Sequence, residues 1–231
     1  MTGPAAIHDY GDAAVLVEPE GDAEAQWSIA QGLARSLVEA PPDGFVDVVA
    51  SFRHAFVAFD PLVTDHTAVA DAVRERLAHP VAEPEPRSFS IPVCYGGDHG
   101  PDLDDVAEVL DLTRDEVVAL HTAQPFVLRF VGSPVTALFV EIPDLPAEIP
   151  RVASPRVRIT PGSVALSGRQ SMIYPVPSPG GWRLIGRTPL RLFDVADPDL
   201  VPYRTGDLVR FVAIGADEWD DHAGQRPEAD A

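Results

Sequence analysis

Short apolar runs with the period of a β-strand alternate with longer runs of helical period in the first part of the chain. The runs with strand period are 13–18, 45–51, 54–60 and 88–95. A helix is predicted over 22–40, and a second one runs from Thr64, its expected N-cap, to Leu77. The apolar face of the first helix consists of Trp27, Ile29, Leu33, Leu37 and Val38. The order β-α-β-β-α-β predicts a ferredoxin-like α+β domain over residues 1–90.

The pattern changes after residue 95. Residues 102–123 predict two short helices, with Asp102 at an N-cap position and a capping box formed by Thr113 and Glu116. Short β-prone runs then follow, separated by Pro, Gly, Ser and Asp, which is typical of a compact sheet sandwich or barrel. These runs are 125–131, 135–142, 156–159, 163–167, 171–176, 182–186, 191–195 and 207–214. We therefore predict an all-β domain over 91–216, with the helices as its lead-in.

The distribution of charge limits the partners of the chain. The net charge of −19 over 231 residues disfavours nucleic acid and anionic membranes as partners. Positive charge is nevertheless concentrated in residues 151–216, which carry nine arginines and four aspartates. All 17 basic residues are arginine, which excludes a P-loop lysine and a Schiff-base lysine. The acidic, turn-rich residues 217–231 are expected to form a disordered tail.

Other classes of protein are disfavoured by what the sequence lacks. No apolar stretch approaches the ~20 residues that span a bilayer, and residues 1–10 do not have the pattern of a secretion signal. We therefore expect a cytoplasmic protein without membrane contact. Cys94 is the single cysteine and lies in an apolar run, where a buried side chain is expected. The seven histidines lack the spacing of a metal site, so no metal is predicted.

Hydrogen-bond donors suited to an anion are concentrated between residues 154 and 189. Guanidinium, amide and hydroxyl groups of this kind bind carboxylates and phosphates. Gly180 and Gly181 permit positive φ and the close approach of a ligand, and Trp182 supplies a flat wall. We predict that Arg156, Arg183 and Arg187 converge on one cavity. The alternative is a barrel corner that needs glycine for steric reasons and tryptophan for packing.

His121 ends the second of the two short helices. A histidine at this position interacts favourably with the negative end of the helix dipole. It could equally supply a polar group to a pocket. Both interpretations remain open from the residues alone.

The C-terminal half also carries the motifs of a known family. The stretch SPGGWRLIGRTPL (178–190), together with the preceding residues 160–177 and GDLVRF (206–211), resembles the family of the 5-oxoprolinase B subunit. This family is also called allophanate hydrolase subunit 1 or the carboxyltransferase domain C/D family, and it includes a sporulation kinase inhibitor. The resemblance continues through 91–122 and 11–18, so that it extends from about residue 7 to residue 214.

The resemblance implies a small α+β domain followed by a cyclophilin-like β-barrel. It implies a subunit that acts with a homologous sister subunit, of the type of allophanate hydrolase subunit 2 or the 5-oxoprolinase C subunit. The implied reaction is ATP-dependent hydrolysis of 5-oxoproline, or a related reaction on an amide as in allophanate hydrolase and urea carboxylase. ATP would be bound by the partner or shared with it. The alternative function is a non-catalytic regulatory protein such as a histidine-kinase inhibitor.

Activation of an amide or lactam carbonyl needs donors aimed at the developing oxyanion. Within the resemblance, the predicted catalytic residues are Arg187, Gln170 and His121. The residues predicted to bind the substrate or an anion are Arg156, Ser163, Tyr174, Ser178, Gly180, Gly181, Trp182 and Thr188. The chain departs from the family pattern at 130–141, where only Gly132 and Pro134 of an aromatic and glycine-rich run are kept, and at 169–172. These changes are expected to reshape the pocket wall.

Overall fold

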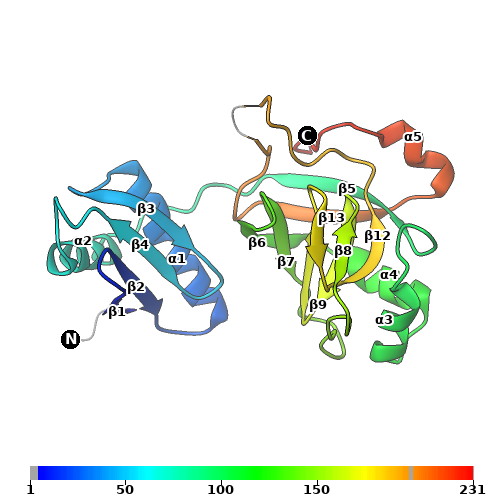
Figure 1. The fold of residues 1–231 in the computed structure, drawn as a ribbon, viewed down its shortest axis with the longest axis horizontal. Helices are drawn as coiled ribbons and strands as arrows, with labels where there is room; N and C mark the ends of the chain where they lie inside the picture. The colour runs from blue at the N-terminus through cyan, green and yellow to red at the C-terminus, as the bar shows by residue number, and fades with distance from the viewer. Residues whose placement is uncertain (1–4, 198–199, 231) are drawn as a thin grey trace. The chain divides into compact units, whose positions relative to one another are not determined.

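The computed structural model describes residues 5–197 and 200–230, which form two compact units that divide between Glu85 and Pro86 (Figure 1). The first unit has an antiparallel sheet in the order β1-β2-β4-β3 and two helices. Its elements are β1 (Ala5–Asp9), β2 (Ala14–Pro19), α1 (Ala23–Glu39), β3 (Phe45–Ala50), β4 (Ala55–Phe59) and α2 (His66–Ala78).

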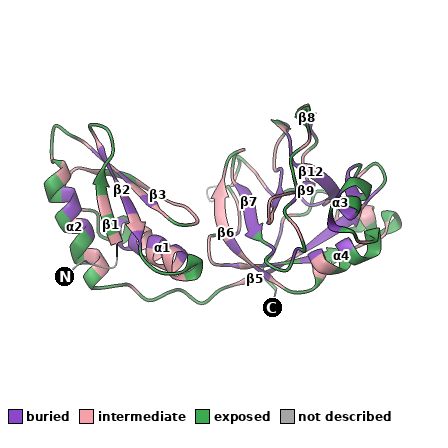
Figure 2. Cartoon of the chain, turned by 90° about the horizontal axis from the view of Figure 1, so that it is seen from below, coloured by how far each residue is buried: buried purple, intermediate pink, exposed green. Residues whose placement is uncertain are grey.

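Both helices of the first unit pack on one face of its sheet (Figures 1 and 2). Alternate residues of β2 and β4 point to this face, because side chains of a strand alternate between its two sides. They meet the apolar faces of α1 and α2 in one core. The fully or nearly fully buried members of this core are Val15, Val17, Ala30, Leu33, Leu37, Ala55, Val57, Phe59, Val69 and Val73.

The predicted ferredoxin-like order of the first unit is not confirmed. A strand that the pattern did not predict, β1, precedes β2, and the run at 88–95 pairs with strands of the second unit. The order is therefore β-β-α-β-β-α. Two details also differ: Val38 is 63% exposed, and the N-cap of α2 is Asp65 rather than Thr64.

The second unit is built on a closed barrel with the strand order β10-β7-β6-β13-β5-β12-β9. This confirms the prediction of an all-β architecture after the short helices. The barrel strands are β5 (Ser88–Tyr95), β6 (Phe126–Gly132), β7 (Ala137–Glu141), β9 (Ser163–Ser167), β10 (Gln170–Ile173), β12 (Arg183–Arg187) and β13 (Leu208–Ala213). The strands β8 (Arg156–Ile159) and β11 (Ser178–Gly180) form a separate two-stranded sheet. The predicted strand at 191–195 is absent from the described structure.

Apolar residues from all seven barrel strands form the core of the second unit. The largest of these are Phe89, Ile91, Leu128, Leu138, Leu166, Ile173, Ile185 and Phe211. The helices α3 (Leu103–Leu110) and α4 (Arg114–Thr122) pack against β12 and β13. The capping box between Thr113 and Glu116 is present at the start of α4, as predicted. Cys94 is buried, which raises the pKa of its thiol.

The end of the chain differs from the predicted disordered tail. It forms a 3-10 turn, η1 (Ala216–Glu218), and a short helix, α5 (Trp219–His222), and then returns along the barrel (Figure 1). Ala229 makes an antiparallel bridge to Phe89, and the Asp230 N–H donates to the Ser88 carbonyl at 2.8 Å. β13 pairs with one edge of β5 over Ser88–Val93, and β12 pairs with β5 only at Cys94 and Tyr95. The other edge of β5 near Ser88 and Phe89 therefore has no partner among the described barrel strands. An open strand edge therefore orders a segment whose composition alone indicates disorder.

Candidate functional site

The predicted site residues fall into three groups in the structure. The first group surrounds the short sheet of β8 and β11, where Arg156 lies opposite Gly180. The guanidinium of Arg156 donates from Nη2 to Oδ1 of Asp102 at 2.7 Å. Its Nη1 is buried and has no hydrogen-bond partner among the described residues. A buried guanidinium N–H without an acceptor is costly, so this position favours a ligand oxygen.

Asp102 anchors this first group to helix α3. It occupies the N-cap position, as predicted, but its side chain does not cap the helix. Instead Oδ2 accepts a hydrogen bond from the Leu184 N–H at 2.7 Å, and the Asp102 N–H donates to the Leu184 carbonyl at 2.9 Å. Asp102 is 6% exposed. The carboxylate therefore joins α3, β8 and β12 at one point.

The Tyr174 hydroxyl explains why residue 180 is glycine. A Cβ atom at Gly180 would lie 2.2 Å from this hydroxyl oxygen, so the buried Tyr174 side chain would have to shift. Burial raises the pKa of Tyr174, while Arg151, the Trp182 N–H and Arg156 act in the opposite direction. At Gly181 a Cβ atom would make only ordinary contacts, the nearest at 3.6 Å to Pro155. Neither glycine has positive φ, so close approach and not backbone conformation is the requirement in this loop.

Trp182 and Arg183 leave this loop in different directions. Trp182 is 9% exposed and packs edge-on against Phe139 at a centroid distance of 5.7 Å, so it is a packing residue rather than the predicted pocket wall. Arg183 pairs with Asp105 on α3 and donates from Nε to the Pro150 carbonyl at 3.3 Å. Ser178, also in the first group, donates to the Val176 carbonyl.

The second group lies at the other end of β12. Arg187 is paired with Ser163 of β9, and its Nε donates to the Pro161 carbonyl at 2.9 Å. Its guanidinium carbon lies 5.2 Å from the ring centroid of Trp219, within the range of a cation–π interaction. The Trp219 ring stacks on His99 at 4.5 Å. Thr188 is buried next to Arg187, and its hydroxyl accepts from the Leu190 N–H.

The third group consists of His121, which is buried at the end of α4, and the half-buried Gln170 of β10. His121 is 1% exposed; its Nδ1 lies 2.7 Å from the Tyr95 hydroxyl and its Nε2 lies 2.8 Å from the Ser171 hydroxyl. Burial lowers the pKa of His121 to about 3 and raises that of Tyr95. The imidazole is therefore neutral, with one nitrogen protonated and the other accepting. Gln170 begins the same strand as Ser171 and pairs with Glu141 and Ser167 through the backbone.

We predicted that Arg156, Arg183 and Arg187 converge on one cavity. The structure does not bring them together. Arg156 and Arg183 both pair with carboxylates at the start of α3. Arg187 lies four residues after Arg183 in β12, and four residues of an extended strand span roughly 13 Å. The sequence pattern shows that these side chains are donors, but it does not show which carboxylates and carbonyls they meet.

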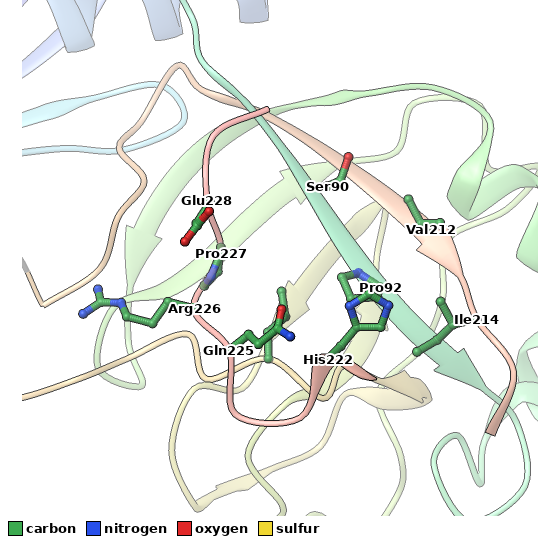
Figure 3. Close-up of a pocket in the computed structure, with 10 residues that line it drawn as sticks. Ser90, Pro92, Val212, Ile214, His222, Gln225, Arg226, Pro227 and Glu228 are labelled. Atoms are coloured by element: carbon green, nitrogen blue, oxygen red, sulfur yellow. The ribbon is translucent and has the colours of Figure 1, made fainter. Parts of the chain in front are cut away.

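A cavity of about 510 Å³ lies between β5, β13 and the returning end of the chain (Figure 3). Its polar lining includes Ser90, His222, Gln225, Arg226 and Glu228. Arg226 pairs with Asp197 at 2.5 Å. Sequence reasoning missed this cavity because it assigned residues 217–231 to a disordered tail. The signals were the aromatic Trp219 together with His222 and Arg226, which are unusual in a disordered acidic segment.

Two classes of site receive no support from the described residues. Within 5–197 and 200–230, no three His, Cys, Asp or Glu side chains are grouped so that they could hold a metal ion. In the same ranges, no helix has the length and apolarity needed to cross a bilayer.

Comparison with known proteins connects this geometry to a family. A family model described as carboxyltransferase domain, subdomain C and D, matches residues 5–202. A Bacillus subtilis protein named as the B subunit of 5-oxoprolinase is 34% identical over 96% of this chain and 98% of its own length. The protein of the same name from Escherichia coli O157:H7 is 37% identical over 87% of this chain and 93% of its own length. The crystal structure of Kluyveromyces lactis urea carboxylase has a TM-score of 0.77 at 17% identity; the match covers 98% of this chain and 24% of the larger one.

Proposed function

Because the chain belongs to the carboxyltransferase domain C and D family, we propose that it is the B subunit of a 5-oxoprolinase, or of a related multi-component enzyme that hydrolyses an amide or lactam. The observation that carries this proposal is the match to two proteins of that name over almost their whole lengths. The likeness to urea carboxylase supports the fold, because the identity there is only 17%. The match covers 98% and 93% of the two named relatives, so we propose for this chain the subunit role that their names state.

The first group of residues is the proposed contact with the substrate. The free Nη1 of Arg156 supplies a donor that a carbonyl or carboxylate oxygen could accept. Asp102 fixes the guanidinium in place, and Tyr174 lies next to it. We propose that this arrangement orients the substrate, and that the residues acting on the scissile bond are completed by a sister subunit. The roles predicted for Arg187, Gln170 and His121 remain predictions, and the burial of His121 favours a structural role for it.

ATP fits this chain poorly as a directly bound co-substrate. The chain contains no lysine, and Arg183 and Arg187 contact a carboxylate, carbonyl groups or an indole ring, which leaves Arg156 as the one arginine of the three with a buried nitrogen that lacks a partner among the described residues. Phosphate cradles instead use convergent backbone N–H groups and free cations. We therefore propose that the partner binds ATP, if the reaction uses it.

The second candidate function is a non-catalytic regulatory protein that binds a histidine kinase. The burial of His121, one of the predicted catalytic residues, favours it, because this side chain is not open to a substrate. The two functions differ in their partners. The test is co-expression of the chain with a candidate sister subunit from the same genome, followed by affinity purification through one tag. A stable complex of defined stoichiometry supports the enzyme; a chain that stays alone but lowers autophosphorylation of a histidine kinase supports the regulator.

A further inference from the structure

Two arginines meet at a cavity in the first unit that the proposed function does not use. The cavity has a volume of about 280 Å³ and lies between α1, α2 and the residues that follow α2. Arg35 of α1 and Arg76 of α2 both line it. The first unit contains fifteen acidic residues and four arginines, so the presence of two arginines at one cavity runs against its overall charge.

The guanidiniums at this cavity have donors without acceptors. Nε and Nη2 of Arg35 are buried, and no described residue accepts a hydrogen bond from them. Nε of Arg76 is likewise buried without an acceptor among the described residues. Its Nη2 donates to the carbonyl of Ala40, the C-cap residue of α1, at 2.8 Å. Arg76 therefore has a structural partner, which these two nitrogens of Arg35 lack among the described residues. Two cations at one cavity, with three buried nitrogens that carry four N–H groups and have no acceptor among the described residues, favour an anion as their ligand.

The acidic side chain in the lining is already engaged. Glu83 accepts a hydrogen bond from the Ser28 hydroxyl. Ser28, Gly32 and Arg35 follow one another at helical spacing and so share one face of α1. This spacing places the hydroxyl contact and the Arg35 guanidinium about two turns apart along the cavity wall.

The remaining lining is apolar and identifies the class of ligand. Ile29, Leu33, Leu77, Pro80 and Val81 contribute to it. Gly32 adds no side chain, which leaves the space open in the middle of a helix where glycine costs about 1 kcal/mol relative to alanine. The volume of about 280 Å³ is just below the usual range for small-molecule pockets, which favours a ligand of only a few heavy atoms. An inorganic anion would leave these apolar walls without contact, whereas a short acid would cover them.

We propose that this cavity binds a small monocarboxylic acid, with its carboxylate between Arg35 and Arg76 and its short apolar body against α1 and Val81. A carboxylate offers two oxygens with about four lone-pair sites, which matches the four N–H groups of these three nitrogens. The site belongs to the first unit alone and does not depend on the amide-hydrolysing function.

The test uses the full chain and n-butyrate as the probe, with n-butanol as the neutral analogue and inorganic phosphate as the anion without an apolar body. Binding is followed by NMR through the Nε–H signals of Arg35 and Arg76. Saturable shifts are expected with butyrate in the millimolar range, with weaker binding of phosphate and none of butanol. Phosphate binding as tight as that of butyrate would overturn the proposal, and so would the absence of saturable butyrate binding.

Three substitutions make the test specific. Arg35→Gln removes a cation whose buried Nε and Nη2 have no acceptor among the described residues, so the fold is retained and affinity for butyrate is expected to fall about tenfold or more. Arg74→Gln is the matched control, because Arg74 is exposed on the same helix as Arg76 and pairs with Asp71. Gly32→Leu is expected to fill the cavity and abolish binding with both arginines kept. Unchanged affinity in Arg35→Gln, or an equal loss in Arg74→Gln, would contradict the proposed site.

A stability readout separates a binding role from a structural one. Arg35→Met replaces the guanidinium with an apolar chain of similar length. In the absence of butyrate this variant is expected to unfold at a higher urea concentration than the wild type, because buried donors without an acceptor are removed. A lower midpoint would mean that Arg35 stabilises the fold and would overturn its assignment as a ligand-binding residue.

Discussion

Asp102 accepts a hydrogen bond from Arg156 Nη2 at 2.7 Å and from the Leu184 N–H at 2.7 Å, so one buried carboxylate holds together a helix start and two strands. The pair joins residues 54 positions apart in the chain. It also fixes the guanidinium whose Nη1 is left free. The candidate site of the second unit therefore depends on a residue that the sequence pattern interprets as a helix cap.

The first prediction concerns this carboxylate. Asp102→Asn is expected to lower the free energy of unfolding by roughly 3 kcal/mol, because it leaves a partly buried guanidinium without its counterion. The measurement is urea unfolding followed by circular dichroism. Asp104→Asn is the control, since Asp104 is exposed on the same helix and pairs with Arg114. Equal unfolding midpoints for the two variants would show that the Asp102 carboxylate stabilises the fold no more than the exposed Asp104 carboxylate does.

The second prediction compares two adjacent glycines. Gly180→Ala is expected to destabilise the second unit strongly, because the new methyl group would lie 2.2 Å from the Tyr174 hydroxyl. Gly181→Ala places its methyl group at ordinary contact distance and should be tolerated. Thermal unfolding of both variants checks the difference. If Gly181→Ala were the more damaging change, the steric account of this loop would be wrong.

The third prediction is a pH dependence of stability. His121 has a pKa of about 3 in the folded state and about 6.5 when unfolded, so below pH 6.5 the unfolded state binds a proton that the folded state does not. The contribution of the neutral His121 to the free energy of unfolding is complete above pH 6.5. It is lost as the pH falls toward 3, by about 1.4 kcal/mol per pH unit. The measurement is urea unfolding over this range.

Carboxylates also titrate at these pH values, so a variant is needed to isolate His121. His121→Gln should have a flatter profile between about pH 6.5 and pH 4 than the wild type. His79→Gln, at an exposed position, serves as the control and should follow the wild type. Parallel profiles for wild type and His121→Gln would rule out the buried neutral imidazole.

The fourth prediction concerns the end of the chain. Trp219→Ala removes the ring that contacts both Arg187 and His99, and it should loosen residues 216–230 from the barrel. The expected loss of stability is only about 1 kcal/mol, but cleavage of this segment by a protease should be faster. Trp219→Phe keeps a flat ring and should remain close to the wild type. Unaltered cleavage in Trp219→Ala would show that other contacts hold the segment.

The sequence pattern predicted the barrel well because strong, short β-prone runs separated by turn residues leave few alternatives. It failed where an element has little pattern of its own. Strand β1, Ala5–Asp9, contains one large apolar residue and is held by pairing with β2. The run 88–95 has the pattern of a strand, but which sheet it joins depends on contacts with β13, more than a hundred residues away. Pairing partners of this kind are not encoded locally.

The candidate site shows the same division. The residue types between 154 and 189 indicated donors, and several of them do lie together around Arg156 and Tyr174. Their partners could not be predicted, because Asp102 comes from a helix and the Pro150 and Pro161 carbonyls come from loops. The same holds for Trp219, whose contact with Arg187 depends on the chain returning to the barrel.

The most direct test of the proposed function is the turnover of 5-oxoproline in a reconstituted mixture. Glutamate formation is measured with this chain alone, with candidate partner subunits alone, and with all of them together, with ATP present throughout. We expect product only in the complete mixture, and less of it when Tyr174→Phe replaces the wild-type chain. Turnover by the partner subunits without this chain, or none in the complete mixture with 5-oxoproline, urea or allophanate, would contradict its assignment to an amide-hydrolysing enzyme.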